Sequence, residues 1–328
     1  MQVAFYERNG PAREVLQVGE LADPLPGPGE VRVRLRYSGV NPSDVKSRAG
    51  RRGAGMPFAR VVPHSDGSGV IDHVGEGVSA SRVGETVWVW NGAWGRPFGT
   101  AAQYIVLPAR QAVALPQGTD MEAGACLGIP ALTAMHAVLC FGGVSGRSVL
   151  VAGGAGAVGS YAVQMARVLG ARQVIATVSS AQKAQLALQA GADATIDYRS
   201  ENVAERARAL TDGAGVDRVI EVDVAANGAL DAEALRPGGQ LVVYGSGTPD
   251  FSLPFVPFIV RNLSAHFFIV YNLSDPDRAL AQETLTRLLA DGRLTHHIAE
   301  RLPLTQIAQA HELVESGRAV GNIVLSIP

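Results

Sequence analysis

The stretch that decides the fold runs from Ser148 to Gly159 and reads SVLVAGGAGAVG. Its first part, Ser148–Ala152, has the apolar character of a parallel strand that is buried on both faces. Its second part contains the glycine motif G-x-G-x-x-G at residues 154–159, and the apolar positions of Ser160–Leu169 fit a helix. A buried strand, this motif and a helix, in that order, predict a turn that binds a dinucleotide.

Five of the six residues of the motif have a physical reason to be there. Gly154 permits the tight turn, Gly156 lets the backbone approach a pyrophosphate, and Gly159 allows the helix to pack closely on the strand. Ala157 and Val158 would open the helix, whose free N–H groups and positive dipole end attract phosphates. These five residues are predicted to bind the cofactor. A glycine-rich turn without a ligand is the alternative, and the flanking strand and helix disfavour it.

The sequence also discriminates between the two nicotinamide cofactors. A site for NAD places Asp or Glu about 20 residues after the motif to hold a ribose hydroxyl. The 20 residues that follow Ala171 contain no acid. Instead the second predicted strand, Gln173–Val178, is followed by Ser179 and Ser180, with Lys183 on the next turn. Two hydroxyls and an ammonium suit a 2′-phosphate, so we predict NADPH (NADP⁺) as the cofactor. Taken alone, Lys183 could be a solvated helix residue.

The two parts of the chain follow different patterns. After the glycine motif, strand patterns at Thr195–Tyr198, Arg218–Val222 and Gln240–Tyr244 alternate with helical ones, which predicts a doubly wound parallel sheet. The first 120 residues instead read as short strands separated by Gly and Pro, with Val31–Tyr37 (VRVRLRY) alternating at period two. They predict a β-rich barrel or sandwich. Helical spacing over Ala123–Cys140 marks the transition.

Composition excludes several classes of function. The 328 residues are 47% hydrophobic and carry a net charge of −2, so the chain can bury a large core and offers no basic field to nucleic acid. Two cysteines form no disulfide framework. The N-terminus lacks a signal pattern, and the apolar runs are far shorter than the ~20 residues that span a bilayer. We expect a soluble, cytoplasmic protein that binds neither nucleic acid nor membrane.

A series of motifs gives the chain a family resemblance. In order they are Asn41-Pro42-Ser43-Asp44-Val45-Lys46, Pro63-His64-Ser65-Asp66-Gly67-Ser68-Gly69, Val74-Gly75-Glu76-Gly77-Val78, the glycine motif, and Gly317-Arg318-Ala319-Val320-Gly321-Asn322. The chain thereby resembles the zinc-independent quinone oxidoreductases (zeta-crystallin type) of the medium-chain dehydrogenase/reductase superfamily. The resemblance implies an α/β fold: a GroES-like β-rich catalytic domain (residues 1–122 plus 272–328) around an inserted Rossmann domain (residues 123–271). It specifies the superfamily better than the substrate.

The resemblance also implies further cofactor contacts. Tyr198 and Arg318 match residues that join the counterpart of Lys183 around the 2′-phosphate. Asn322 matches a residue near the nicotinamide carboxamide. The residues matched to segments that line the nicotinamide are Gly245, Ser246, Phe268, Ile269 and Val270.

Three residues are candidates for the chemistry. The family places the counterpart of Asn41 beside the nicotinamide, and that of Lys46 on the cofactor ribose or the substrate carbonyl. Hydride addition from NADPH to a quinone or an enone requires the protein to position the acceptor and to stabilise negative charge on its oxygen. Asn41 and Lys46 meet this requirement, and Thr133 is a weaker candidate. Asn41 could instead shape a turn before Pro42, and Lys46 could be solvated. We identify no proton donor.

We expect no metal ion. Catalytic zinc in this superfamily needs Cys or His, then His, then Cys or Asp at definite places. The first position is Asn41 and the second aligns with Ser65, while the neighbouring His64 is one residue out and should project elsewhere. The remaining histidines considered lack partner spacing and are predicted at the surface: His296, His297 and His311.

Two other functions stay open. Arg48, Arg51 and Arg52 would attract an enoyl or acrylyl thioester if they faced the substrate site, or they form a solvated loop. A protein that binds NADPH with little turnover is the non-enzymatic alternative. The resemblance further implies a homodimer that pairs through an edge strand at Ser264–Tyr271, because pairing would cover its apolar edge.

Overall fold

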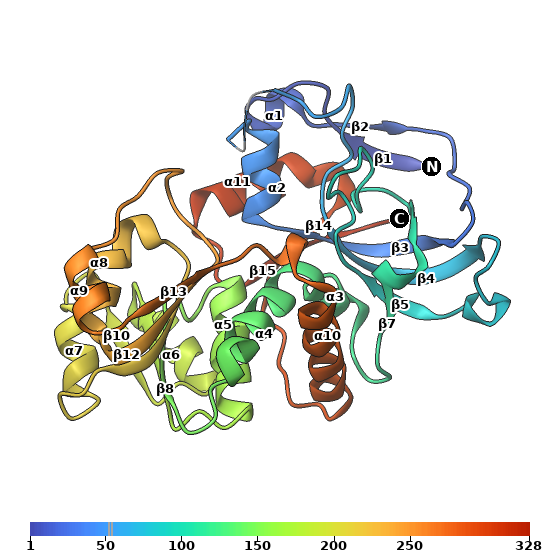
Figure 1. The fold of residues 1–328 in the computed structure, drawn as a ribbon. Coiled ribbons are helices and arrows are strands. Elements are labelled where there is room, and N and C mark those ends of the chain that lie inside the picture. Colours follow the sequence, from blue (N-terminus) through green and yellow to red (C-terminus); the bar gives the residue numbers. More distant parts are fainter. Residues whose placement is uncertain (52, 54) are drawn as a thin grey trace. The chain divides into compact units, whose positions relative to one another are not determined.

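The computed structural model describes residues 1–51, 53 and 55–328, and its contacts divide the chain into two compact units (Figure 1). Unit 1 comprises Met1–Ile129 with His296–Pro328, and unit 2 comprises Pro130–Thr295. Unit 2 is therefore inserted into unit 1 along the chain. The boundaries expected from the sequence differ mainly at α10 (Asp275–Ala290), which packs against α4 (Leu132–Leu139) within unit 2.

Unit 2 is built on a parallel sheet with the strand order β10-β9-β8-β11-β12-β13. Leu150 of β8 lies opposite Ile175 of β9 on one side and Val219 of β11 on the other. The order reverses between β8 and β11, and in such sheets ligands bind beyond the carboxyl ends of the strands at that reversal. The predicted doubly wound sheet is confirmed. Its strands are β8 (Ser148–Val151), β9 (Gln173–Val178), β10 (Ala194–Asp197), β11 (Val216–Glu221), β12 (Leu235–Val243) and β13 (Ser264–Phe267).

Helices connect these strands and bury their apolar faces on the sheet. Side chains of α5, among them Tyr161 and Met165, are fully buried, as the apolar spacing of the sequence predicts. Among the described residues, no helix has the length and apolar character needed to cross a membrane. Besides α4 and α10, the helices of unit 2 are α5 (Ala157–Val168), α6 (Ala181–Gln189), α7 (Val203–Ala209), α8 (Val224–Ala234) and α9 (Phe255–Val260).

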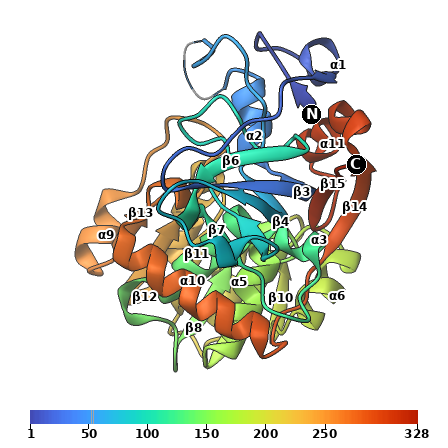
Figure 2. The same cartoon turned by 90° about the vertical axis from the view of Figure 1, so that its right-hand side faces the viewer.

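Unit 1 is β-rich, with the strand order β14-β15-β3-β4-β5-β7 and with β6 also paired to β3 (Figure 2). In Figure 1 the red β15 lies beside the blue β3, because the end of the chain returns to the sheet that its beginning forms. On β3 the apolar side chains Val33 and Leu35 are buried and Arg34 is exposed, as their alternation predicts. The strands are β1 (Gln2–Phe5), β2 (Gln17–Glu20), β3 (Glu30–Val40), β4 (Asp66–Val74), β5 (Thr86–Val89), β6 (Tyr104–Pro108), β7 (Ala112–Ala114), β14 (Ile298–Pro303) and β15 (Asn322–Ser326); the helices are α1 (Ala12–Val15), α2 (Pro42–Arg48), α3 (Met121–Gly124) and α11 (Ile307–Ser316).

The prediction of a single helix over Ala123–Cys140 is wrong. The structure has α3, then a π-helical turn at Leu127–Ala131, and only then α4. Pro130 lies inside the turn and has no N–H to donate. A Cβ on Gly128 would lie 2.6 Å from a backbone oxygen of β5, so the chain approaches the sheet too closely there for a regular helix with side chains. The interruption coincides with the division between the units.

Candidate functional site

The glycine motif forms the turn between β8 and α5, and this turn is tied to β9. The N–H of Gly154 donates to the carbonyl oxygen of Thr177 at 3.0 Å, and the N–H of Gly153 donates to the Thr177 hydroxyl at 3.0 Å. A Cβ on Gly154 would lie 2.5 Å from the Cβ of Ala176. Only glycine therefore fits at this point of the turn.

The first turn of α5 presents an open face of backbone donors. Gly156 is its N-cap and is exposed, and a Cβ there would meet only the carbonyl oxygen of Gly153, at 3.2 Å. Ala157 and Val158 begin the helix, where N–H groups have no partner within the helix. A Cβ on Gly159 would lie 2.1 Å from the Gly153 oxygen, so the helix packs directly on the turn. These residues fit the pyrophosphate of a dinucleotide.

The residues predicted to hold a 2′-phosphate gather after β9. Ser180 caps α6 by accepting a hydrogen bond from the N–H of Lys183 at 3.3 Å, and the Nζ of Lys183 donates to the hydroxyl of Ser179 at 3.1 Å. Tyr198 follows β10, the neighbouring strand, with 52% of its surface exposed. Lys183 and Lys46 are the only lysines in the sequence, whereas Lys and Arg together number 28.

Gly245 and Ser246 follow β12 beside the end of β11. A Cβ on Gly245 would lie 2.2 Å from the carbonyl oxygen of Val222. The N–H of Gly247 donates to the carboxylate of Asp223 at 2.6 Å. The loop that is predicted to line the nicotinamide is thereby fastened to the segment that leads into α8.

A buried pair of carboxyl groups, which no sequence pattern marks, adjoins this loop. Glu221 ends β11 with no exposed surface, Asp231 on α8 is 3% exposed, and each of these carboxyl groups shifts the pKa of the other. Glu221 Oε1 also accepts from the N–H of Asp223 and from Nδ2 of Asn227. Burial raises the pKa of Glu221, and burial together with the Glu221 charge raises the pKa of Asp231 well above its usual range. Ionisation of both carboxyl groups at once is therefore disfavoured.

The other predicted residues of unit 2 lie on α4 and after β13. The Phe268 ring meets the ring of His136 edge-on, with centroids 4.6 Å apart, and Thr133 lies buried one turn earlier on α4. Ile269 is partly exposed, whereas Val270 is buried. Val270 therefore supports the segment from inside, whereas Phe268 and Ile269 keep accessible surface.

In unit 1, Asn41 joins β3 to α2. Its backbone N–H donates to Asp44 Oδ2 at 2.8 Å in a capping box, and its Nδ2 donates to Asp66 Oδ2 at 2.8 Å. Both Asn41 and Asp66 are buried. Asn41 does shape the start of a helix, and its side chain is in addition held by an acid from β4.

The remaining predicted residues of unit 1 have different exposures. Lys46 is half-buried on α2, Arg318 is exposed just after α11, and Asn322 is buried at the start of β15. The N–H of Asn322 donates to the carbonyl oxygen of His297 at 2.9 Å. The candidate residues are thus divided between the units, with Asn41, Lys46, Arg318 and Asn322 in unit 1 and the others in unit 2.

The surface position predicted for His311 is wrong. His311 lies on the buried face of α11 with Ile307 and Ala310, and its Nε2 is 2.9 Å from Nε2 of His64, which is also fully buried. Burial lowers the pKa of His64 to about 3 and that of His311 well below its usual range, so both rings are neutral. His297 is exposed as predicted, and its neighbour His296 is half-buried.

The three arginines do not act as one cluster. Arg48 is buried, donates to the carbonyl oxygen of Gly10, and pairs with the carboxylate of Glu315 at 2.5 Å. Arg51 is exposed, and Arg52 lies outside the described residues.

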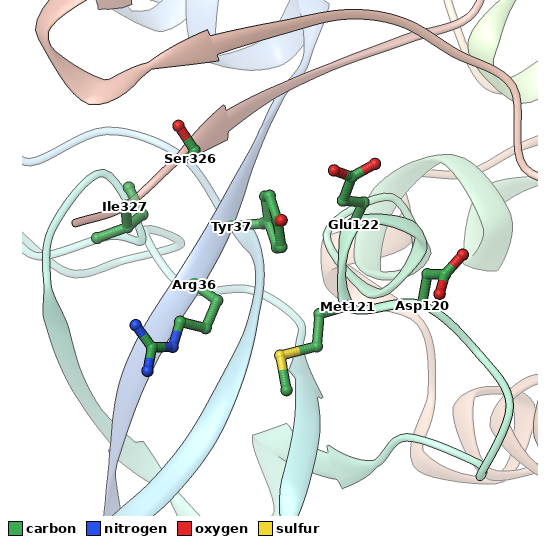
Figure 3. Close-up of a pocket in the computed structure, with 7 residues that line it drawn as sticks. All are labelled: Arg36, Tyr37, Asp120, Met121, Glu122, Ser326 and Ile327. Carbon is green, nitrogen blue, oxygen red and sulfur yellow. The ribbon is translucent and has the colours of Figure 1, made fainter.

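A separate pocket of about 700 Å³ opens on unit 1 (Figure 3). Glu122 at its edge pairs with Arg301 at 2.7 Å. None of the lining residues that the structure describes is a predicted site residue; they are Arg36, Tyr37, Asp120, Met121, Glu122, Ser326 and Ile327.

Comparison with known proteins places this geometry in a family. Residues 27–117 match the alcohol dehydrogenase GroES-like domain, and residues 157–288 match the zinc-binding dehydrogenase family. A quinone oxidoreductase of Pseudomonas aeruginosa is 33% identical, over 99% of this chain and 98% of that protein. The chain belongs to the quinone oxidoreductase family. Membership of this family confirms the predicted GroES-like and Rossmann-like parts of the fold.

Solved structures related to this quinone oxidoreductase family member have the same fold. The Escherichia coli quinone oxidoreductase complexed with NADPH has a TM-score of 0.87 at 26% identity, covering 99% of this chain and 100% of that one. A structure described as an NAD-dependent alcohol dehydrogenase has a TM-score of 0.91 at 30% identity, with 100% of both chains covered. Although one matching family is described as zinc-binding, the described residues contain no group of three or more His, Cys, Asp or Glu placed to hold a metal ion.

Proposed function

We propose that this protein is an NADPH-dependent reductase that transfers hydride to quinones or other activated alkenes without a metal ion. The observation that carries the proposal is the hydrogen bond from Nζ of Lys183 to the hydroxyl of Ser179. Ser179 follows β9, the strand after the glycine turn, where an NAD site would place a carboxylate. Tyr198 and Arg318 would complete the site for the 2′-phosphate. The NADPH complex of the Escherichia coli relative supports this choice of cofactor.

Bound NADPH would supply the hydride, and the protein would supply position and charge stabilisation. Gly245, Ser246, Phe268 and Ile269 would line the nicotinamide, and Asn322 would bond its carboxamide. Hydride addition to a quinone or an enone leaves negative charge on the acceptor oxygen. An N–H of Asn41 and the ammonium of Lys46 are the groups proposed to stabilise that charge, with Thr133 as a further hydroxyl.

The thioester alternative loses its main support. Arg48 is occupied by Glu315 and by the Gly10 carbonyl, so it is not available to an anionic substrate. That alternative would rest on Arg51 and Arg52 alone. A quinone or an enone needs no such cluster.

We also propose that unit 2 pairs with a second copy of this chain through β13. The strand ends at Phe267, earlier than the predicted Tyr271, but Phe267 and Ile269 still expose apolar surface at the edge of the sheet. On α9, large apolar side chains are more exposed still: Phe255, Val256, Ile259 and Val260. Such an apolar edge is a liability that pairing removes. Sedimentation at micromolar concentration should therefore give the mass of a dimer.

Lys183 offers the sharpest test of the proposed cofactor. Lys183→Glu should raise the Kd for NADPH about 10- to 100-fold, because a charge-assisted bond to phosphate is replaced by repulsion. The Kd for NADH should change little, and Lys183→Arg, which keeps the charge, should retain most of the NADPH affinity. Titration calorimetry with both cofactors measures all four changes. Equal loss with both cofactors would contradict the assigned role.

The scarcity of lysine provides an independent measurement. Lys46 and Lys183 are the only lysine side chains that an amine-acylating reagent can modify in this sequence. Saturating NADPH should protect Lys183, as quantified by peptide mass spectrometry. Unchanged acylation of Lys183 would argue against its contact with the cofactor.

A further inference from the structure

The side-chain amide of Asn41 is held at both ends. Its Nδ2 donates to Asp66 Oδ2 at 2.8 Å, and the capping box makes the same side chain accept from the N–H of Asp44. Because the nitrogen donates and the oxygen accepts, the orientation of the amide follows from its partners. An amide nitrogen carries two hydrogens, and the bond to Asp66 uses one of them.

Asp66 is an unusual partner because it is an acid without exposed surface. It begins β4, and its carboxyl group lies against the π-helical turn, where a Cβ on Gly128 would be 2.4 Å from Oδ1. Burial raises the pKa of Asp66, and the hydrogen bond from Asn41 opposes this shift. A buried carboxyl group costs folding free energy. The hydrogen bond that Asn41 donates to Asp66 Oδ2 offsets part of this cost.

A buried chain of hydrogen bonds fixes the backbone of Asp66 as well. The hydroxyl of Thr100 donates to the Asp66 carbonyl oxygen at 2.5 Å, so the 2.8 Å bond between Ser38 and Thr100 must use the proton of Ser38. Ser38 Oγ then accepts from Nδ1 of His64 at 2.9 Å. Nε2 of His64 in turn accepts from Nε2 of His311 at 2.9 Å. The direction of each hydrogen bond in the chain is thereby assigned.

We propose that Asp66 is a positioning residue, which holds the Asn41 carboxamide so that its remaining N–H can bond the oxygen on which charge develops during hydride transfer. The inference rests on the proposed reductase function. Without the carboxyl group, the Asn41 amide can rotate away or turn over. A misplaced donor weakens the transition state, so kcat should fall while the affinity for NADPH is kept.

A double-mutant cycle tests whether Asp66 acts through Asn41. Asp66→Ala should lower kcat about 10- to 100-fold and change the Kd for NADPH less than about 3-fold. Asp66→Asn still accepts from Asn41 through its amide oxygen and should recover most of the rate. In an Asn41→Ala background, Asp66→Ala should cause almost no further loss. Asp72→Ala is the matched control, since Asp72 lies on the same strand and binds Arg32 at 2.9 Å instead.

Two kinetic results would overturn the proposal. One is an equal loss from Asp66→Ala with and without Asn41, and the other is Asp66→Asn being as slow as Asp66→Ala. If Asp66→Ala does not fold, Asp66→Asn is carried through the same cycle. Any loss that it causes must then vanish in the Asn41→Ala background.

A readout without substrate separates this proposal from the reductase function. In ¹⁵N-labelled protein, one side-chain N–H of Asn41 should exchange slowly with solvent, and Asp66→Ala should make it exchange quickly. An unchanged exchange rate would overturn the positioning role whatever the activity. The two outcomes can also differ. If the exchange is slow and depends on Asp66 but the protein reduces no quinone or enone, the reductase function is refuted, while the hydrogen bond between Asp66 and Asn41 still stands.

Discussion

Each unit buries a pair of groups of the same kind that would repel each other if both were charged: two histidines in unit 1 and two carboxyl groups in unit 2. These two pairs respond to pH in opposite directions. In unit 1 the rings of His64 and His311 meet at 2.9 Å, and burial lowers the pKa of both. In unit 2 the carboxyl groups of Glu221 and Asp231 are both buried, and burial raises the pKa of both.

The difference shows that the two parts of the candidate site should lose stability at opposite ends of the pH range. The histidine pair ends the hydrogen-bond chain that holds Asp66, so acid should loosen unit 1 first. The carboxyl pair supports the segment that fastens the Gly245 loop, so a rising pH should loosen unit 2 first. Stability should be greatest between these limits, and variants of single members of each pair can separate them.

The largest effect is expected in acid, from His311. The unfolded chain protonates histidine below pH about 6.5, whereas the folded pair resists protonation down to about pH 3 at His64. Stability is therefore complete above pH 6.5 and is lost as the pH falls, by about 2 kcal/mol per histidine between pH 7 and 5. His311→Gln should reduce the stability that is lost between pH 7 and 5 by the contribution of one histidine, about 2 kcal/mol. The substitution should itself lower the free energy of unfolding at pH 7 by about 1–3 kcal/mol, because a buried hydrogen bond is disturbed.

Guanidinium denaturation at pH 7, 6 and 5 measures both effects of His311→Gln. His297→Gln is the control, because His297 is exposed. A pH dependence that is the same in wild type and in His311→Gln would show that the pair does not respond to acid as described.

A smaller effect of opposite sign is expected from Asp231→Asn. The folded pair keeps a proton that the unfolded chain releases above pH about 4, so the stability that the pair contributes is complete below that pH and is lost as the pH rises. Asparagine has no proton to lose. Asp231→Asn should therefore stabilise the protein by about 1–2 kcal/mol at pH 8, with the gain disappearing near pH 4.

Asp217→Asn gives the matched contrast in the same unit. Although burial raises the pKa of Asp217, hydrogen bonds from Ser148 and Arg236 lower it overall. Removing this charge should destabilise the protein at pH 8. If Asp231→Asn and Asp217→Asn both destabilise the protein at pH 8, burial of the Glu221–Asp231 pair does not cost stability there, and the prediction is wrong.

The smallest effect is expected from an exposed pair of opposite charges next to His311. Arg13 and Glu312 lie 2.7 Å apart, with 72% and 39% of their side chains exposed. Solvent and salt screen such a pair, so Arg13→Ala should leave the midpoint of denaturation unchanged within error. A shift as large as that of His311→Gln would mean that burial does not decide the difference between the pairs.

The sequence predicted unit 2 better than unit 1, for a physical reason. Local patterns mark the glycine turn because it lies between one strand and the helix that follows it. They mark Lys183 for the same reason, since its bonds to Ser179 and Ser180 lie at the start of a single helix. The helical spacing over Ala123–Cys140 does not predict the break at Pro130, although proline inside a helical pattern is a local signal. The apolar run that ends at Val270 predicts an exposed edge, whereas in the structure β13 ends at Phe267 and Val270 is buried. Where a strand ends depends on how the segment after it packs, which a local pattern does not show.

The network around Asn41 depends on segments that are far apart in the chain. Asp66 was visible in a motif, but its bond to Asn41 spans 25 positions, and the contact between His64 and His311 spans 247. His311 lies on the same face of α11 as Ile307 and Ala310, and this helical spacing in the sequence indicates that His311 is buried. No local pattern could have paired it with His64, nor Glu221 with Asp231.

The transfer of deuterium from NADPH labelled at C4 of the nicotinamide to an enone such as 2-cyclohexenone tests the proposed reaction most directly. We expect consumption of NADPH and a saturated ketone with deuterium on its β-carbon, as detected by nuclear magnetic resonance. Tight binding of NADPH, with neither label transfer to the enone nor NADPH oxidation by any quinone, would contradict the proposed function and favour a protein that binds the cofactor without turnover.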